Sequence, residues 1–301
     1  MGRKYSQLEE KRENFKFGFV ALISLSTLIL CNSCASVPSR TKAVPVTAIL
    51  GAFNDEVVML EEQLAGKQEQ KIEGIRFATG KLKARKVVVA WTGIGKVNAA
   101  MTTTLLIDHF RPNQVIFTGI AGGINPELFP GDVVIGAKTA QHDLGMLTPS
   151  GLEHEGVVNP VTHRQNPVFF HADVRLLKLA ELAARQVKLE KTKTGSTERT
   201  PRIIKGVIVT GDVFVASTYK CAELRKTLGA DAVEMEGAAV AQICHQQGIP
   251  YLVIRGISDR AGDKSLEDLG KYLKIAARNS AALVTEMLES ISSQHAVEMS
   301  K

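Results

Sequence analysis

The sequence predicts one α/β domain with a central mixed, largely parallel twisted sheet flanked by helices. From about Val44 onward, β-branched apolar runs alternate with Ala-rich helical stretches. Several apolar runs end directly in glycine, at Gly51, Gly93, Gly119 and Gly211, where the backbone can turn sharply and approach a ligand. The sequence shows no internal repeat of fixed period, which argues against solenoids and propellers.

In the first half of the chain, the predicted strands are short apolar runs rich in valine and isoleucine, with helical stretches between them. In order, they are a strand at 45–50, a helix at 55–64, a strand at 86–92, a helix at 96–110, and strands at 114–120 and 132–138. The helix at 55–64 begins with acidic residues, which the positive end of a helix dipole favours. The helix at 96–110 follows the glycine turn of TGIGKVNAA.

In the second half, Ala-rich helices and buried-type strands alternate again. The predicted elements are a helix at 174–186, a strand at 203–211, a helix at 218–228, a short strand at 232–235, a helix at 238–247, a strand at 251–257 and a helix at 266–289. Two regions interrupt this rhythm. Residues 146–173 hold Pro, Asn, Gly and His with weak periodicity, so we predict a long functional loop or lid. Residues 190–202 are polar and predict an exposed connector.

The first 40 residues are predicted to be a targeting segment and linker, ahead of a domain at 44–292 and a polar tail at 293–301. Basic residues precede an apolar run from Phe17 to Leu30, which is shorter than a membrane span but suits a signal peptide. Cys31 and Cys34 follow, as in a bacterial lipoprotein signal whose Cys is lipidated. A short uncleaved anchor helix is the alternative. Either way, we expect an exported protein, periplasmic or anchored to the membrane.

Charge and cysteine content restrict the possible partners. The net charge is +6, but residues 1–40 hold six Lys or Arg and three Glu, so half of it lies outside the predicted domain. No basic run interleaved with aromatic residues is present, and we therefore expect no nucleic-acid partner. Cys221 and Cys244 form no CxxC pattern, so we expect no metal site. The histidines of the long loop lack metal-ligand spacing and are predicted to be loop residues: His142, His154, His163 and His171.

Three acidic residues follow apolar strands at separate places in the chain. Glu56 lies in ILGAFNDEV, Glu236 in AVEMEGAAVAQ and Asp259 in YLVIRGISD. Taken singly, Glu56 could be a helix-start acid, Glu236 an ion-pair partner of Arg255, and Asp259 a turn cap. Ligands of α/β sheets bind beyond the carboxyl ends of strands, where all three are expected. One shared site is the more economical interpretation.

The glycine turn TGIGKVNAA is a weak cofactor motif. Asn98 stands where the third glycine of a dinucleotide fingerprint belongs, and no acidic residue follows at the spacing that binds ribose. We therefore expect no cofactor. The turn can still offer free backbone N–H groups to a polar ligand, or it can be a tight turn alone.

Six motifs taken together resemble a known family. GAFNDEV, TGIGKVNAA, TGIAGGINPELFPGDVVI, VTGDVF, AVEMEG and YLVIRGISD look like successive motifs of the nucleoside phosphorylase superfamily, and most closely of its 5'-methylthioadenosine/S-adenosylhomocysteine nucleosidase branch. The resemblance covers Val46 to about Ser290. It implies a single-domain, three-layer fold, a homodimer, and hydrolysis of adenine nucleosides in purine metabolism and methionine salvage, with a nucleoside and water as substrates.

The resemblance also implies roles for residues. Asp259 would be the general acid toward the purine N7, and Glu56 would lie near the attacking water as base or orienter. Glu236 would bind the ribose hydroxyls, with Met235 packing on the sugar, and Arg255 would fix the water or the carboxylates. The remaining expected contacts are Phe214 stacking on adenine, the backbone of Val215 at the base edge, Ser258 orienting Asp259, Gly122 in the glycine motif, and Ile94, Phe53 and Leu269 around the 5'-substituent.

Two other functions remain open. A phosphorylase would use phosphate in place of water and needs arginine and hydroxyl groups around an anion, which the acidic loop Asn54 to Glu56 disfavours. A non-catalytic nucleoside-binding relative is the second alternative, which the three carboxylates disfavour. Ile120 occupies the position of a serine in the related motif TGSAGG, which leaves the rate or the substrate open. The sequence does not distinguish methylthioadenosine from S-adenosylhomocysteine or another 6-aminopurine nucleoside.

Overall fold

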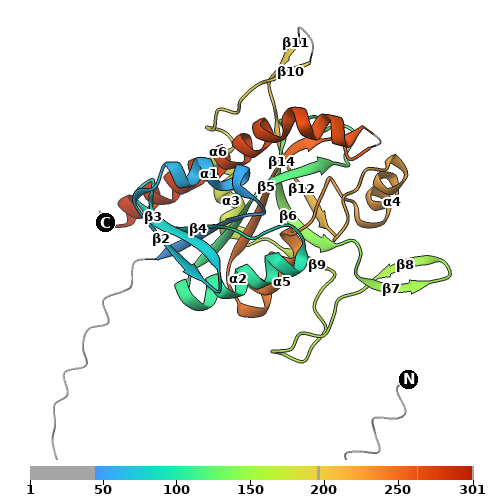
Figure 1. Cartoon of the computed structure of the whole chain (residues 1–301), viewed down its shortest axis with the longest axis horizontal. Helices are drawn as coiled ribbons and strands as arrows, with labels where there is room; N and C mark the ends of the chain where they lie inside the picture. The colour runs from blue at the N-terminus through green and yellow to red at the C-terminus, as the bar shows by residue number, and fades with distance from the viewer. Residues whose placement is uncertain (1–44, 195–196, 263, 300–301) are drawn as a thin grey trace, which may run out of the picture. The chain divides into compact units, whose positions relative to one another are not determined.

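The computed structural model describes residues 45–194, 197–262 and 264–299 (Figure 1). The predicted targeting segment, with Cys31 and Cys34, lies outside the described residues. No helix in the described part of the chain has both the length and the hydropathy of a membrane-spanning helix.

A ten-stranded mixed sheet forms the centre of the domain. Its strand order is β13-β12-β6-β14-β5-β1-β4-β3-β2, and β9 pairs with β6. The strands are β1 (Val46–Gly51), β2 (Ala65–Ile72), β3 (Ile75–Leu82), β4 (Arg85–Trp91), β5 (Gln114–Gly123), β6 (Val133–Gln141), β9 (Phe169–His171), β12 (Ile203–Thr210), β13 (Ala232–Glu234) and β14 (Tyr251–Asp259). The predicted mixed sheet is thus confirmed, but it is not largely parallel: of its described strand pairings, five are parallel and five are antiparallel.

Five of these strands form a closed ring. β13 pairs in parallel with β12 and antiparallel with the end of β5, at Gly122 and Gly123. Since β5, β14, β6 and β12 are consecutive neighbours, β13 completes a ring. The pairing of β14 with β5 shifts register between Ile257 and Asp259, which is a β-bulge at the end of the strand. Bulges redirect side chains, and this one lies where the predicted catalytic acid is found.

Helices cover both faces of the sheet (Figure 1). Helices α1 (Asn54–Glu62), α3 (Val174–Ala183) and α6 (Ser265–Met299) pack with one another on one face, and α2 (Lys96–Phe110) and α5 (Gly237–Gln247) pack on the other. Both faces of the sheet are apolar, because side chains alternate along a strand. In β14, Leu252 and Ile254 pack in the core with α1, α3 and α6, and Val253 packs in the core with α2 and α5. Helix α4 (Thr218–Leu228) packs in a third, smaller core beside the ends of β12 and β13.

Several elements differ from the prediction. Strands β2 and β3 were not predicted. Strand β2 is exposed, and its sequence is the polar run AGKQEQKI, which has no apolar pattern. The predicted lid at 146–173 contains a hairpin of β7 (Gly145–Thr148) and β8 (Gly151–His154), followed by β9. The predicted connector at 190–202 contains a second hairpin, of β10 (Thr192–Thr194) and β11 (Thr197–Arg199). Helix α6 continues to Met299, so most of the expected polar tail is helical.

Candidate functional site

A cavity of about 340 Å³ lies at the carboxyl ends of β1, β5, β12, β13 and β14. The glycine turn after β4 and the start of α6 also contribute apolar residues to its wall. Its lining residues are Ala52, Phe53, Glu56, Ile94, Ile120, Ala121, Gly122, Val213, Phe214, Val215, Val233, Glu234, Met235, Glu236, Ser258, Asp259, Leu269 and Leu273. Every predicted site residue except Arg255 is in this wall, and Arg255 is buried against the carboxylates.

Glu56 is fixed by the first turn of α1 and by backbone donors from two strand ends. Its Oε1 accepts a hydrogen bond of 2.8 Å from the Ile120 N–H, and its Oε2 accepts from the N–H groups of Ala52 and Phe53. The side chain is 1% exposed. Burial raises the pKa of Glu56, although Arg255 and these N–H groups oppose the shift. Glu56 is therefore a carboxylate with increased basicity that faces the cavity.

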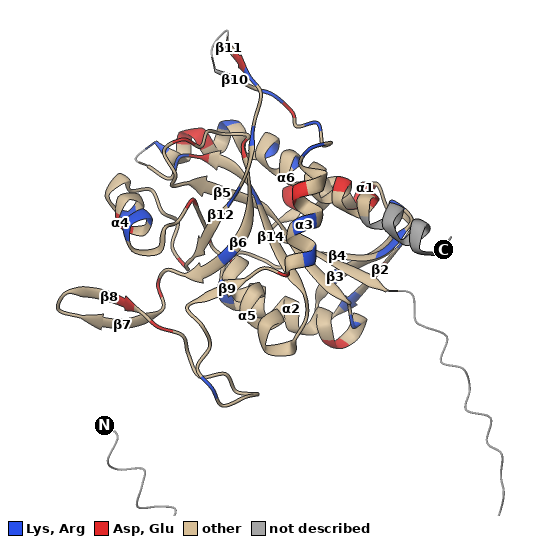
Figure 2. Cartoon of the chain, turned by 180° about the vertical axis from the view of Figure 1, so that it is seen from behind, with Lys and Arg blue, Asp and Glu red and all other residues tan. Residues whose placement is uncertain are grey.

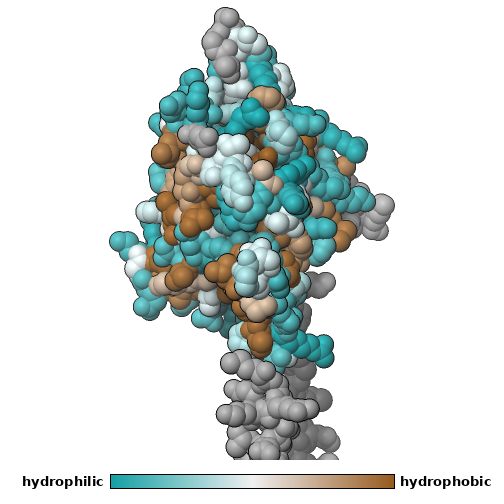
Figure 3. Space-filling model, turned by 90° about the vertical axis from the view of Figure 1, so that its right-hand side faces the viewer, coloured by the Kyte–Doolittle hydropathy of each residue, from teal (hydrophilic) through white to brown (hydrophobic). Residues whose placement is uncertain are grey.

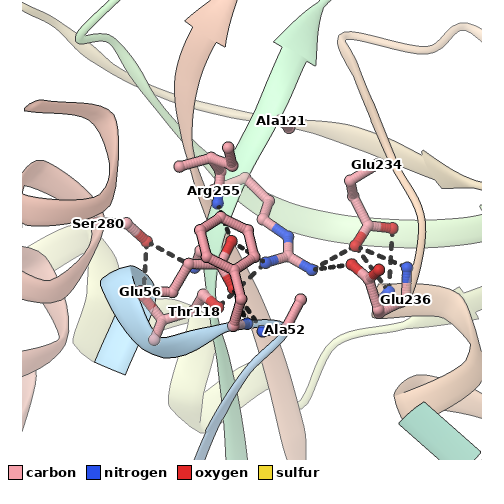
Figure 4. A network of polar contacts seen from close by, with 12 residues as sticks. Ala52, Glu56, Thr118, Ala121, Glu234, Glu236, Arg255 and Ser280 are labelled. Carbon is pink, nitrogen blue, oxygen red and sulfur yellow. Dashed lines mark hydrogen bonds and ion pairs between the residues drawn. The ribbon is translucent and has the colours of Figure 1, made fainter. Parts of the chain in front are cut away.

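Arg255 lies at the centre of three carboxylates (Figure 4). Its guanidinium contacts Glu234, Glu236 at 3.4 Å and Glu56 at 3.6 Å, and it donates to the Thr118 carbonyl at 3.0 Å. It is fully buried, and its guanidinium carbon lies 4.1 Å from the ring centroid of Phe117. A buried arginine between acidic groups offsets charges that would otherwise be strongly unfavourable. Arg255 thus holds the carboxylates in place.

Glu234 is the site residue that the sequence analysis missed. It accepts hydrogen bonds from Arg255, from the Thr210 hydroxyl, and from the N–H groups of Glu236 and Gly237. These contacts join the ends of β12, β13 and β14 to the first turn of α5. The signal was present, because the motif AVEMEG contains a second acid two residues before Glu236, and residues two apart along a strand point to the same face.

Glu236 is the N-cap residue of α5 and lies 4% exposed in the cavity wall. Its Oε1 accepts a 2.8 Å hydrogen bond from the Gly95 N–H of the glycine turn. Burial and the neighbouring charge of Glu234 raise the pKa of Glu236 to about 8, against the effects of Arg255 and Gly95. The glycine turn therefore binds a protein carboxylate.

Asp259 ends β14 at the bulge and is 2% exposed. Its Oδ2 accepts from the Ser258 hydroxyl at 2.8 Å, and its Oδ1 accepts from the Ala261 N–H at 2.7 Å. Burial raises the pKa of Asp259, and these two donors oppose the shift. A Cβ at Gly122 would lie 2.8 Å from the Cβ of Ala261 and 3.0 Å from Asp259 Oδ1, so glycine leaves the space that this carboxyl occupies.

Part of the wall is apolar and more accessible to solvent. Phe214 is 46% and Ile94 55% exposed, and both line the cavity with Leu269. Phe214 lies in the segment between β12 and α4, which has no strand or helix structure. Large exposed aromatic and aliphatic side chains beside a polar centre suit a ligand with one flat apolar part and one polar part.

The donors around the polar centre are already engaged. The N–H groups of Ala52 and Ile120 bind Glu56, and the Gly95 N–H binds Glu236. The described wall contains no lysine or arginine. An anion at this place would meet carboxylates, whereas a neutral hydroxyl group or a water molecule would find acceptors. The geometry thus favours hydroxyl-bearing substrates over phosphate.

The histidines of the predicted loop have other surroundings. His154 and His171 lie in β8 and β9, so their prediction as loop residues is wrong. His142 is buried in the turn after β6, with its ring against Gly211. Within the described ranges, no group of three or more His, Cys, Asp and Glu residues could hold a metal ion.

The sequence profile of the phosphorylase superfamily matches residues 46–289. The chain belongs to the phosphorylase superfamily. A 5'-methylthioadenosine/S-adenosylhomocysteine nucleosidase of Tolumonas auensis is 38% identical over 244 residues, which are 81% of this chain and 98% of that protein. The predicted superfamily, and the resemblance to its methylthioadenosine/S-adenosylhomocysteine nucleosidase branch, are therefore confirmed.

Solved structures show the same phosphorylase fold. The nucleosidase of Neisseria meningitidis, in complex with methylthio-immucillin-A, has a TM-score of 0.69 and 37% identity, covering 81% of this chain and 99% of that one. The futalosine hydrolase of Helicobacter pylori has a TM-score of 0.69 and 30% identity, covering 82% and 98%. The nucleoside phosphorylase-like α/β fold is thereby confirmed.

Proposed function

We propose that this phosphorylase-superfamily chain is an enzyme that hydrolyses the N-glycosidic bond of 5'-substituted adenine nucleosides, such as 5'-methylthioadenosine or S-adenosylhomocysteine. The products are adenine and the substituted ribose. The observation that carries the proposal is the convergence of Glu56, Glu236 and Asp259 from separate strand ends on one cavity. Relatives named as nucleosidases, at 37–38% identity over most of the chain, support it.

Bond cleavage begins with the leaving group. Adenine is a poor leaving group unless it is protonated, and Asp259 is an acid that lines the same cavity as Phe214. Because burial raises its pKa, Asp259 keeps its proton to a higher pH than an exposed aspartate. The proton passes to N7, the bond from the sugar carbon to N9 breaks with its electron pair going to the base, and the sugar carries the positive charge.

The sugar is then hydrated on its other side. Glu236, held by Gly95, accepts hydrogen bonds from the ribose hydroxyls, and Met235 packs on the sugar ring. Glu56 takes a proton from the water whose oxygen forms the new bond to the sugar carbon. Burial makes Glu56 more basic than an exposed glutamate. Arg255, which is itself paired with Glu234, holds both carboxylates while these charges change.

Water, in preference to phosphate, is the second substrate. A phosphorylase must supply several donors to an anion, but here the N–H groups near Glu56 bind Glu56 itself, and Arg255 is shared among three carboxylates. The engaged donors therefore favour hydrolysis over phosphorolysis.

The test is turnover of a nucleoside panel by the purified full-length protein, with and without phosphate. The panel contains 5'-methylthioadenosine, S-adenosylhomocysteine, 5'-deoxyadenosine, adenosine, inosine and futalosine, because a structural relative is a futalosine hydrolase. We expect release of free adenine that does not depend on phosphate, and loss of at least about 100-fold in kcat for Asp259→Asn and Glu56→Gln. A phosphate-dependent ribose 1-phosphate product, or full turnover by either variant, would overturn the proposal.

A homodimer is part of the proposal. Exposed apolar residues on α2, on the β7–β8 hairpin and on the following loop are available to bury against a second copy: Val97, Met101, Met146, Leu147, Val157, Val158 and Val161. Figure 3 shows apolar side chains among hydrophilic ones on the face seen there. Sedimentation of the wild type and of Leu147→Asp tests this: we expect a dimer that dissociates in the variant, and a wild-type monomer would refute it.

Export remains a proposal from the sequence. We propose that residues 1–40 direct the domain at 44–292 out of the cytoplasm, with Cys31 or Cys34 as the lipidated residue. Labelling cells with a fatty-acid probe tests the anchor. We expect the protein to be labelled, and we expect Cys31→Ser, Cys34→Ser or their combination to remove the label. Unlabelled cytoplasmic protein would contradict the proposal.

We propose no nucleic-acid partner. Basic and acidic residues are interspersed over the elements in Figure 2, whereas nucleic-acid binding requires a basic patch.

A further inference from the structure

Three charged residues outside the catalytic carboxylates form a closed cluster beside the cavity. Lys96 Nζ lies 2.6 Å from Asp143 Oδ1, and the Asp212 N–H donates to Asp143 Oδ2 at 2.8 Å. The Lys96 N–H donates to Asp212 Oδ1 at 2.7 Å, and Lys96 Nζ lies 3.8 Å from Asp212 Oδ2. Each member therefore contacts the other two. We name this group the Lys96–Asp143–Asp212 cluster.

The cluster joins three segments that shape the site. Lys96 directly follows Gly95, whose N–H binds Glu236, so two successive amides bind two different carboxylates. Asp143 lies between β6 and the β7–β8 hairpin. Asp212 stands two residues before Phe214 in the cavity wall. The position of the aromatic wall is thereby tied to the glycine turn that holds Glu236.

The segment that carries Phe214 needs such a support. Between the end of β12 at Thr210 and the start of α4 at Thr218, the backbone has no strand or helix hydrogen bonding. Its two ends are held, because the Gly211 N–H donates to the Glu234 carbonyl and the Ser217 N–H to the Ala261 carbonyl, both at 3.1 Å. Asp212 supplies further contacts inside the segment, next to the residues that would meet the base.

The chemistry of Asp143 suits a support of this kind. Its side chain is 27% exposed and that of Lys96 is 17% exposed, so water screens the pair less than a surface pair. Burial alone would raise the pKa of Asp143, but the hydrogen bonds from Lys96 and Asp212 hold it below its ordinary value. Asp143 is thus ionised at neutral pH and keeps its contacts with Lys96 and with the Asp212 N–H.

We propose that Asp143, together with Lys96, is a positioning residue for nucleobase binding, which acts by fixing residues 211–215 against the glycine turn. The inference rests on the proposed function, because it assumes that Phe214 meets adenine. Asp143 does not line the catalytic cavity. It acts through Asp212 and the segment that follows.

The test compares Asp143→Ala and Asp143→Asn with the wild type in two assays. Calorimetry gives the Kd of adenine without turnover, and steady-state kinetics give kcat and KM. For Asp143→Ala we expect about tenfold weaker adenine binding and a similar rise in KM, since a loosened wall weakens base binding. For Asp143→Asn, which keeps an acceptor for the Asp212 N–H, we expect a smaller change. The pH dependence of kcat should not move, because no proton-transfer group changes.

A matched control separates positioning from general stability. Glu181→Ala removes the Glu181–Lys205 pair, whose 2.7 Å separation is close to the 2.6 Å of the Lys96–Asp143 pair but which joins exposed side chains on α3 and β12. We expect unchanged adenine binding for this control. Asp143 variants that bind adenine as tightly as the wild type, or that lose affinity no more than the control, would refute the proposal.

A double-mutant cycle tests the route of the effect. If Asp143 acts through Phe214, then Asp143→Ala should change adenine affinity about tenfold in the wild type but less than about twofold in the Phe214→Ala background. Additive losses would overturn the proposal while leaving the nucleosidase function intact. A wild-type protein that binds no adenine would instead refute the proposed function itself.

Discussion

Gly119→Ala is the substitution that most sharply tests the packing of the polar centre. Gly119 lies in β5 with φ of +153°, and its Cα faces the ion pair of Glu56 and Arg255. A Cβ there would lie 2.5 Å from Glu56 Cδ, and closer still to Glu56 Oε1 and Arg255 Nη1. Ordinary contacts between carbon atoms are about 3.5–4.0 Å, so the methyl group requires a displacement of about 1 Å.

Neither partner can move away into solvent, because Glu56 is 1% and Arg255 0% exposed. Breaking a buried charged pair destabilises a protein by about 3–5 kcal/mol. A misplacement of about 1 Å in a catalytic group lowers turnover by about 100-fold. For Gly119→Ala we therefore expect a destabilisation of about 3 kcal/mol or more, together with a loss of kcat/KM of at least about 100-fold.

The assays are denaturant unfolding for stability and adenine release for kcat/KM. Gly270→Ala is the matched control, since nothing lies within 4 Å of a Cβ at Gly270 and its helical position in α6 accepts alanine. We expect the control to keep wild-type kinetics and stability or to gain slightly in stability. Wild-type stability and turnover for Gly119→Ala would refute the described packing of Glu56 against Arg255.

Three further predictions follow from the pKa shifts and the wall. The profile of kcat/KM against pH should be bell-shaped, with an acid limb from Glu56 and an alkaline limb from Asp259. Both limbs should lie above the ordinary carboxyl values of 4.5 and 3.8, because burial raises both pKa values; a limb at or below its ordinary value would contradict this. Glu236→Gln should lower turnover, yet its Tm should exceed that of the wild type above pH 8. The raised pKa means that ionising Glu236 destabilises the folded state as pH rises from 4.5 through about 8, and the gain should vanish below pH 4.5. A Tm difference that does not change with pH would refute that reasoning. Ile120→Ser should shift the acid limb to lower pH, because a hydroxyl and its water beside Glu56 reduce the desolvation that raises its pKa; an unmoved limb would show that Ile120 does not shield Glu56.

The sequence predicted the site better than it predicted the edges of the fold. The carboxylates could be located because each follows an apolar strand, and strand ends meet at one edge of an α/β sheet. Strand β2 could not be found, because an exposed strand of Lys, Gln and Glu has no apolar alternation. The closing contact of β13 with β5 is only two residues long, and no local pattern specifies it.

Within the site, the missed residues are those that act at long range. The sequence analysis gave the Arg255–Glu236 pair only as an alternative and expected Arg255 to fix the water or the carboxylates. The structure gives Arg255 three acidic partners, and one of them, Glu234, had been assigned no role. The contact of Gly95 with Glu236 joins residues 141 positions apart. Such contacts depend on how β4, β12 and β13 are arranged in the sheet, which composition and periodicity do not specify.

The central claim is that acidic side chains from distant strands act on one nucleoside and deliver water to its sugar. Turnover of 5'-methylthioadenosine by the full-length protein in H₂¹⁸O, followed by mass spectrometry of the products, measures this directly. We expect one ¹⁸O atom at the anomeric carbon of the released methylthioribose and unlabelled adenine, at the same rate with and without phosphate. An unlabelled sugar phosphate, or intact nucleoside after prolonged incubation with folded protein, would contradict the account.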